Sequence, residues 1–328
     1  MRNHTWRIVA MLVASAVLAM VPLDVMAQFG KPKTKTESAN MKTSLGEYKG
    51  LKHAIGCKDF ENQAGWHGQW EIGNNLAIML ESALYDTGRF VLVEREKLKD
   101  VIAEQDLAAS GRTAKAKNVA KTGLIRSARY IGTGAVTGVE ESQAGADGGI
   151  SFKGIRLGGG RSQSQINVIV KLIDTTTGEI VAKESIVGKA GKAGLRVGLS
   201  VGGLDTDLGG FAKTPLGEAA QDCINQAAEF IAKKMEEFPF EGSVIKVGKN
   251  GQVIINRGGE FGVEVGQELV MAEEGELLTD PDTGEILGKE DGELIGNLKV
   301  VKVDEKMSYC DVVKGEKNPV PGTVVRAQ

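Results

Sequence analysis

The sequence has few of the side chains that usually carry catalysis. Three histidines occur among 328 residues, and only His53 and His67 remain after the first 27. The zinc-protease pattern HExxH and the phosphate-binding pattern GxxxxGK(S/T) are both missing. The paired carboxylates Glu94 and Glu96 fit a helix cap or a strand-end ion pair. We therefore expect a protein that is not an enzyme and that uses neither a metal nor a cofactor.

Aromatic residues are also rare, at 5% of the chain. One of the three tryptophans lies within the first 27 residues, whereas Trp66 and Trp70 lie four residues apart in the stretch AGWHGQWEIG. A helical pattern begins directly afterwards. One interpretation is that an indole packs beneath Ile72 or Leu76 and fixes the start of that helix.

Neither sign of charge dominates, because 40 Lys and Arg are set against 43 Asp and Glu, for a net charge of −3. No basic face of the kind that binds nucleic acid is evident. The one long apolar run, IVAMLVASAVLAMV, follows a basic start and precedes VMA, as in a signal peptide. We expect residues 1–27 to be removed on export and residues 28–48 to form a flexible leader. No cysteine lies near the cleavage point, so we expect a periplasmic or outer-membrane protein that is not lipidated.

The cysteines number three, which leaves at least one unpaired. Cys57, Cys223 and Cys310 each lie in an apolar stretch, which favours small buried core residues. A bridge between Cys57 and Cys223 remains open in an oxidising compartment.

Between residues 49 and 238 the apolar pattern changes repeatedly between strand and helix periods. The predicted order of elements is β-α-β-α-β-β-β-α, which indicates an α/β domain. Helices are predicted over residues 72–87, 96–110 and 215–238, and strands over residues 51–60, 89–95, 128–141 and 166–187, the last range forming a hairpin.

After residue 242 the helical period disappears, and short Val- and Ile-rich runs are separated by Gly, Asn and Asp. Residues 242–328 are therefore predicted to form a small all-β, barrel-like domain. Within it, Asp280, Asp282 and Glu285 resemble a calcium loop, but Gly284 stands where that pattern requires Asp or Asn. A plain hairpin turn is the favoured interpretation.

Two Gly-rich inserts interrupt the α/β pattern at about residues 139–166 and 186–212. In the second, apolar and polar residues alternate as in a transmembrane β-strand. The first is less regular, and its parity requires a bulge near Gly154. The membrane-facing candidates are Ile150, Phe152, Leu195, Val197, Leu199 and Val201. Spanning hairpins would need a barrel shared among several copies, because lipid cannot satisfy open strand edges. Flexible surface loops are the alternative.

Several segments resemble the curli production assembly/transport (CsgG) family of secretion channels. They include DFENQAGW, LAIMLESALYDTGRFVLVEREKLKDVIAEQDLAASG, ARYIGTGAVTGVEES and VIVKLIDTTTGEIV. The resemblance implies a periplasmic α/β domain whose two inserted hairpins form an outer-membrane barrel in a ring of identical subunits. It also implies that the loop after the first strand lines the channel constriction, which makes Trp66, His67, Gln69 and Trp70 the constriction candidates. The helix-start interpretation of the indoles remains open beside it.

The resemblance implies a non-enzymatic, ring-forming channel subunit for exported polypeptide. The expected partners are further copies of the chain, unfolded secreted polypeptide and envelope accessory proteins, without nucleic acid. The C-terminal β-domain and the absent lipidation site depart from the family pattern. A soluble periplasmic adaptor or activator of an envelope assembly, built on the same α/β fold, is the alternative.

Overall fold

The computed structural model describes residues 45, 46, 48, 50–114, 119–141, 150–152, 155–157, 164–190, 210–212, 214–315 and 319–327. For residues 150–152 and 155–157 only the backbone is described. The expected signal peptide, most of the expected leader and the second candidate membrane strand with Leu195, Val197, Leu199 and Val201 lie outside the described residues.

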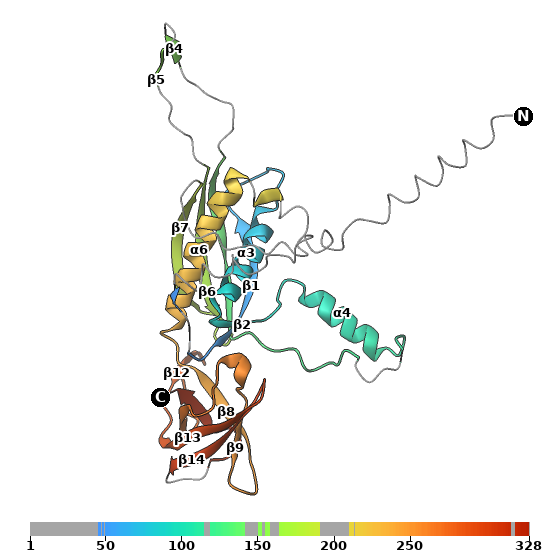
Figure 1. Ribbon diagram of the computed structural model, residues 1–328, viewed down its shortest axis with the longest axis vertical. Helices are drawn as coiled ribbons and strands as arrows, with labels where there is room; N and C mark the ends of the chain where they lie inside the picture. Colours follow the sequence, from blue (N-terminus) through green and yellow to red (C-terminus); the bar gives the residue numbers. More distant parts are fainter. Residues whose placement is uncertain are drawn as a thin grey trace, which may run out of the picture. The chain divides into compact units, whose positions relative to one another are not determined.

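A five-stranded mixed sheet forms the centre of the α/β domain (Figure 1). Its strand order is β2-β1-β3-β6-β7. β1 runs parallel to both β2 and β3, whereas β3, β6 and β7 are successively antiparallel. The strands are β1 (His53–Asn62), β2 (Phe90–Leu92), β3 (Tyr130–Glu140), β6 (Gln165–Asp174) and β7 (Ile180–Lys189).

Two helices, α3 (Ile72–Thr87) and α6 (Pro215–Met235), pack against each other and against the sheet. α3 ends at Gly88, whose φ of 68° is in the left-handed region that glycine adopts without strain. α6 begins with Pro215 after Thr214, whose hydroxyl oxygen accepts a hydrogen bond from the backbone N–H of Gly217 at 3.0 Å. The core consists of apolar residues from both helices and one sheet face, including Ile55, Leu76, Leu80, Val168, Ile224 and Ile231.

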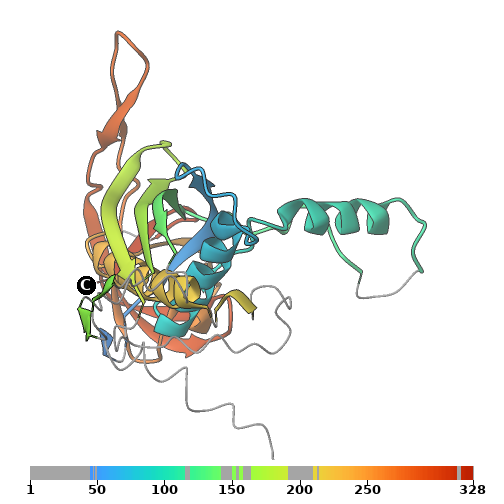
Figure 2. The same ribbon diagram turned by 90° about the horizontal axis from the view of Figure 1, so that it is seen from above.

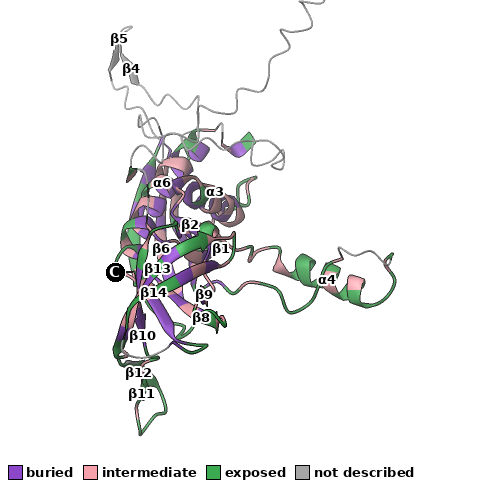
Figure 3. Ribbon diagram, turned by 60° about the horizontal axis from the view of Figure 1, so that its bottom comes forward, coloured by how far each residue is buried: buried purple, intermediate pink, exposed green. Residues whose placement is uncertain are grey.

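The remaining helix, α4 (Leu98–Ala109), projects from the domain (Figures 1 and 2). None of its residues is buried, as the burial colours in Figure 3 show. Val101, Ile102 and Leu107 are about two-fifths exposed, at 40%, 43% and 41%. The sequence therefore predicts the helix, but its apolar residues have no cover within the described part of the same chain.

Residues after α6 form a closed six-stranded barrel with the strand order β10-β13-β14-β9-β8-β15. Its strands are β8 (Glu241–Val247), β9 (Val253–Ile255), β10 (Glu268–Ala272), β13 (Leu294–Val303), β14 (Ser308–Gly315) and β15 (Val324–Ala327), with a short 3-10 helix η2 (Gly259–Phe261). A separate two-stranded hairpin, β11 (Leu277–Thr279) and β12 (Ile286–Lys289), extends from the barrel. The barrel has its own apolar core around Val253, Leu269, Leu298 and Val325.

All three cysteines are free and buried. Cys57 and Cys223 are thus core residues and form no disulfide with each other. Burial raises the pKa of the Cys223 thiol to about 12, so the group stays protonated and unreactive at neutral pH.

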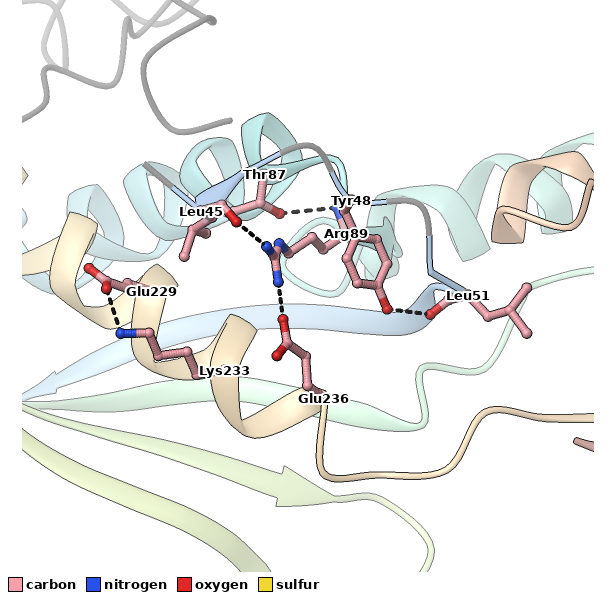
Figure 4. A network of polar contacts seen from close by, with 8 residues as sticks. All are labelled: Leu45, Tyr48, Leu51, Thr87, Arg89, Glu229, Lys233 and Glu236. Carbon is pink, nitrogen blue, oxygen red and sulfur yellow. Dashed lines mark hydrogen bonds and ion pairs between the residues drawn. The ribbon is translucent and has the colours of Figure 1, made fainter. Parts of the chain in front are cut away.

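A buried arginine ties the chain before β1 to the end of α6 (Figure 4). The Arg89 guanidinium is 9% exposed, pairs with Glu236, donates to the Leu45 carbonyl at 2.5 Å and lies 4.8 Å from the Tyr48 ring centroid. The end of the segment expected to be a free leader is therefore bound to the domain.

We expect Arg89→Ala to lower the free energy of unfolding by about 2 kcal/mol, because the buried arginine loses its ion pair with the half-exposed Glu236 and its hydrogen bond to the Leu45 carbonyl together. The control is Lys233→Ala, which removes the neighbouring exposed pair with Glu229, 65% and 46% exposed. That change is expected to cost less than about 0.5 kcal/mol. Urea unfolding measures both, and equal effects would contradict the structure's placement of Arg89.

Candidate functional site

Three connecting segments leave the sheet at the same end, which we call the insertion edge. The edge is formed by Asn62 at the end of β1, Glu140 at the end of β3, Gln165 at the start of β6 and Lys189 at the end of β7. The pairing fixes this: Asn62 lies opposite Val136, four residues before Glu140, while Gln165 lies opposite both Glu140 and Lys189. The tryptophan loop and both Gly-rich inserts therefore start from adjacent strand ends.

The strand ends that carry the inserts are held by backbone hydrogen bonds. Ala190 donates to the Ser164 carbonyl at 2.9 Å, which continues the β6–β7 pairing beyond Lys189. The Lys189 N–H donates to the Asp222 carboxylate of α6 at 3.0 Å. A Cβ at Gly188 would lie 2.0 Å from the Ala219 carbonyl oxygen, so only glycine allows α6 to pack this closely on β7. The inserts thus leave from a fixed base.

The second insert returns to the domain at Phe211, which is fully buried. Its ring centroid lies 5.7 Å from that of Trp70, tilted by 55°. The Thr214 hydroxyl donates to the Phe211 carbonyl at 2.8 Å and so joins this residue to the cap of α6. Sequence reasoning missed Phe211, although its position just before the Thr214–Pro215 helix start is a signal that could have found it.

Trp66 also packs inward, against the core of the α/β domain. The Asn62 side chain holds its backbone from both sides, donating to the Trp66 carbonyl at 2.7 Å and accepting from its N–H at 3.1 Å. A Cβ at Gly68 would lie 2.0 Å from the indole ring, so the loop lies directly on this ring. Within the described residues the indole Nε1 is buried without a hydrogen-bond partner.

The four constriction candidates therefore do not form one cluster. Trp66 and Trp70 are half-buried against the domain, whereas His67 and Gln69 are exposed. Trp70 contacts Phe211 of the second insert, a contact that the helix-start interpretation does not include. The loop thus presents polar side chains outward from an aromatic base.

Part of the first insert is a short antiparallel pair, β4 (Ile150–Phe152) and β5 (Ile155–Leu157). Ile150 lies opposite Leu157, and Phe152 lies opposite Ile155. Positions directly opposite each other share one face of a strand pair. The chain reversal therefore brings the apolar positions to one face, and the bulge expected near Gly154 is not needed to reconcile their parity.

Of the two carboxylates beside Arg95, Glu94 binds the backbone at the start of α4, in line with the helix-cap interpretation. The Glu94 carboxylate accepts from the N–H groups of Glu96 and Lys97 at 2.7 and 2.9 Å, just before α4 begins. Burial, and then the neighbouring Glu94 carboxylate, raise the pKa of Glu81. Among the described residues, no group of His, Cys, Asp and Glu has an arrangement that could hold a metal ion.

No helix in the described part of the chain combines the length and apolar character needed to cross a membrane.

The fold and the site define a mixed α/β domain that carries two long insertions on one end of its sheet. Comparison with protein families matches residues 39–249 to "Curli production assembly/transport component CsgG". The chain belongs to this family, as the sequence resemblance predicts, and the family comprises secretion components of the cell envelope and not enzymes. Most of the C-terminal barrel lies beyond the matched residues.

Several solved structures show low similarity to this chain. The hypothetical protein CT253 from Chlamydia trachomatis is 10% identical, with a TM-score of 0.34 over 57% of this chain and 99% of that chain. A PelC dodecamer from Paraburkholderia phytofirmans is 14% identical, with a TM-score of 0.27 over 55% and 87%. Protein XCC0632 from Xanthomonas campestris is 12% identical, with a TM-score of 0.27 over 57% and 88%. No curated protein matches the sequence.

Proposed function

We propose that this chain is the subunit of a ring-shaped, non-enzymatic channel that passes exported polypeptide across the outer membrane. The observation that carries the proposal is the insertion edge, where both Gly-rich inserts and the tryptophan loop leave the sheet together. In the proposed channel, the inserts supply the membrane strands and the tryptophan loop faces the lumen, and their common origin at one end of the sheet supports this.

Strand chemistry supports the assembly into a ring. A pair of strands such as β4–β5 leaves two edges with unpaired backbone groups, which lipid cannot satisfy. Neighbouring copies satisfy these edges when their hairpins join into one closed barrel. Identical subunits joined by the same head-to-tail contact form a ring when the rotation between neighbours closes.

The exposed face of α4 is a second argument for contact between copies. Val101 and Ile102 lie on one face of α4 and are exposed, on a helix without buried residues. An amphipathic helix this short gains most of its stability from packing. We propose that a neighbouring subunit supplies that packing.

The tryptophan loops of all the subunits are proposed to line the channel together. Exposed His67 and Gln69 would face the lumen, and Trp66 and Trp70 would anchor the loop and border it. Repeated around a ring, amide and imidazole groups offer weak contacts to any passing backbone, without specific recognition of a side-chain sequence.

Membrane extraction of the full chain followed by particle imaging tests the proposal. We expect the protein to stay with outer membranes after carbonate washing and to form closed rings after detergent extraction. A monomer that carbonate releases would contradict the channel.

One observation favours the alternative of a soluble periplasmic adaptor. The barrel and its exposed hairpin β11–β12 offer a binding surface that the passage of polypeptide does not require. A monomer in the periplasmic fraction that retains a bound envelope protein would support this alternative.

A further inference from the structure

The hairpin that extends from the barrel has an unusual composition. Residues 273–293, which we call the acidic hairpin, contain nine carboxylates and one lysine, a net charge of −8 in a chain whose total is −3. Between the carboxylates stand exposed apolar side chains, of which Leu278 is 52% and Leu287 66% exposed. Strong charge and exposed leucines together are typical of a docking surface and not of a solvated loop.

Both ends of the acidic hairpin have a defined geometry. At its base, a Cβ on Gly275 would lie 1.6 Å from the Glu290 carbonyl oxygen, and one on Gly292 would lie 1.8 Å from that of Glu273. At its tip, the Asp280 carboxylate accepts from the backbone N–H groups of residues 282 and 283 at 2.7 and 3.1 Å. The close backbone contact at the base and the hydrogen-bonded turn at the tip fix the conformation of the hairpin at both ends.

The acidic hairpin is nevertheless incomplete by itself. β11 and β12 form a sheet of only two strands, and among the described residues no other strand pairs with the outer edge of either. A two-stranded ribbon is marginally stable in water, and a third strand or other cover is needed for independent stability. Its partner should supply apolar contacts and positive charge.

The same chain carries a segment with those properties. Between residues 107 and 129 the sequence holds six Lys or Arg and no Asp or Glu, and two of the six, Lys121 and Arg126, lie in residues 119–127. Residues 119–127, which we call the return segment, lead back to β3 and belong to no helix or strand. In this segment Lys121 is exposed, Leu124 is 73% exposed and Ile125 is 39% exposed. Arg126 at its end pairs with Glu260 of the barrel domain at 2.5 Å.

We propose that the acidic hairpin of one copy docks against the return segment of a neighbouring copy. Opposite charge orients the two surfaces, and the exposed leucines of each cover those of the other. The two surfaces differ, so the contact is head-to-tail and leaves one free surface of each kind to continue the assembly. The inference rests on the proposed ring only in requiring that copies lie side by side.

Cross-linking between two single-site variants of the full chain tests the docking. One carries Leu124→Cys and the other Leu287→Cys, each with a different tag, and the mixture is treated with a bismaleimide. We expect a product that contains both tags. The parental chain is the control, because its three cysteines are buried. The mixture also excludes a link within one chain.

Charge reversal then tests whether opposite charges hold the acidic hairpin against the return segment. We expect Glu276→Lys with Glu285→Lys on the hairpin variant to lower the cross-linked yield about fivefold, as two exposed ion pairs imply. Arg112→Glu with Lys121→Glu on the other variant should do the same, and the yield should return when both reversed variants are mixed. Lys246→Glu with Lys249→Glu, elsewhere on the barrel, should change little.

Raising the salt concentration tests the same charges without any variant. The cross-linked yield should fall at 0.5 M salt, because the Debye screening length shortens to about 4 Å. Rings without the mixed product, or a yield that charge reversal leaves unchanged, would overturn the docking and leave the channel intact. A chain that is monomeric and forms no mixed product would overturn both proposals. A hairpin that cross-links only to another envelope protein would also overturn the docking.

Discussion

Removing residues 144–159 should abolish retention of the protein in the outer membrane while leaving the α/β domain folded. Glu140 and Gln165 are cross-strand partners, so the residues that remain between them can close a turn. The hydrogen bond from Ala190 to the Ser164 carbonyl also lies outside the deletion. Carbonate washing of isolated membranes measures the retention, and circular dichroism of the purified protein measures the fold.

Single substitutions sharpen this experiment. Phe152→Arg places a charge at one of the apolar positions and is expected to cost about 2–4 kcal/mol per subunit at a lipid-facing site. Ser151→Arg is the matched control, because position 151 falls on the other face of the strand pair. Retention of both variants would contradict a membrane role for this hairpin. Loss of both would contradict the assignment of its faces.

Trp70→Ala should lower the free energy of unfolding by about 2 kcal/mol, since roughly half of a buried ring's contribution is lost at a half-buried site. The ring packs against Phe211, so the substitution loosens the base of the second insert as well as the loop. Trp66→Ala should have a similar effect, because its indole also packs on the core. Chemical unfolding monitored by circular dichroism measures both.

The controls are Gln69→Ala and His67→Ala, which change exposed side chains. They are expected to alter the free energy of unfolding by less than about 0.5 kcal/mol and to change single-channel conductance. Altered conductance with unchanged stability in Trp66→Ala or Trp70→Ala would instead assign the indoles to the lumen. Unchanged conductance in all four variants would contradict the constriction.

Much of the α/β domain could be predicted from periodicity. β6 alternates strictly between buried and half-buried residues, and α3 ends at the glycine that the sequence indicates. α4 shows the limit of this reasoning, because its apolar stripe predicts a helix but cannot say which molecule covers it. Phe211 shows another limit, since its contact with Trp70 joins residues far apart in the sequence.

The candidate site was harder to predict than the fold. The family resemblance makes Trp66, His67, Gln69 and Trp70 one group of constriction candidates. Packing separates them, since the indoles have the most apolar area to bury and the polar side chains between them have the least. The parity of the first insert was misjudged for a related reason, because a chain reversal changes which positions share a face.

The insertion edge has a mechanical consequence. β6 is hydrogen-bonded to β3 on one side and to β7 on the other, and these strands carry the stems of both inserts. A force applied to either insert along the strands therefore loads the ladders in shear, because their hydrogen bonds lie perpendicular to the strands. The hydrogen bonds of a ladder then share the load instead of opening one at a time. In the proposed channel, a polypeptide that drags on one insert would pull on the other through the same strand, so both inserts and the sheet would bear the force together.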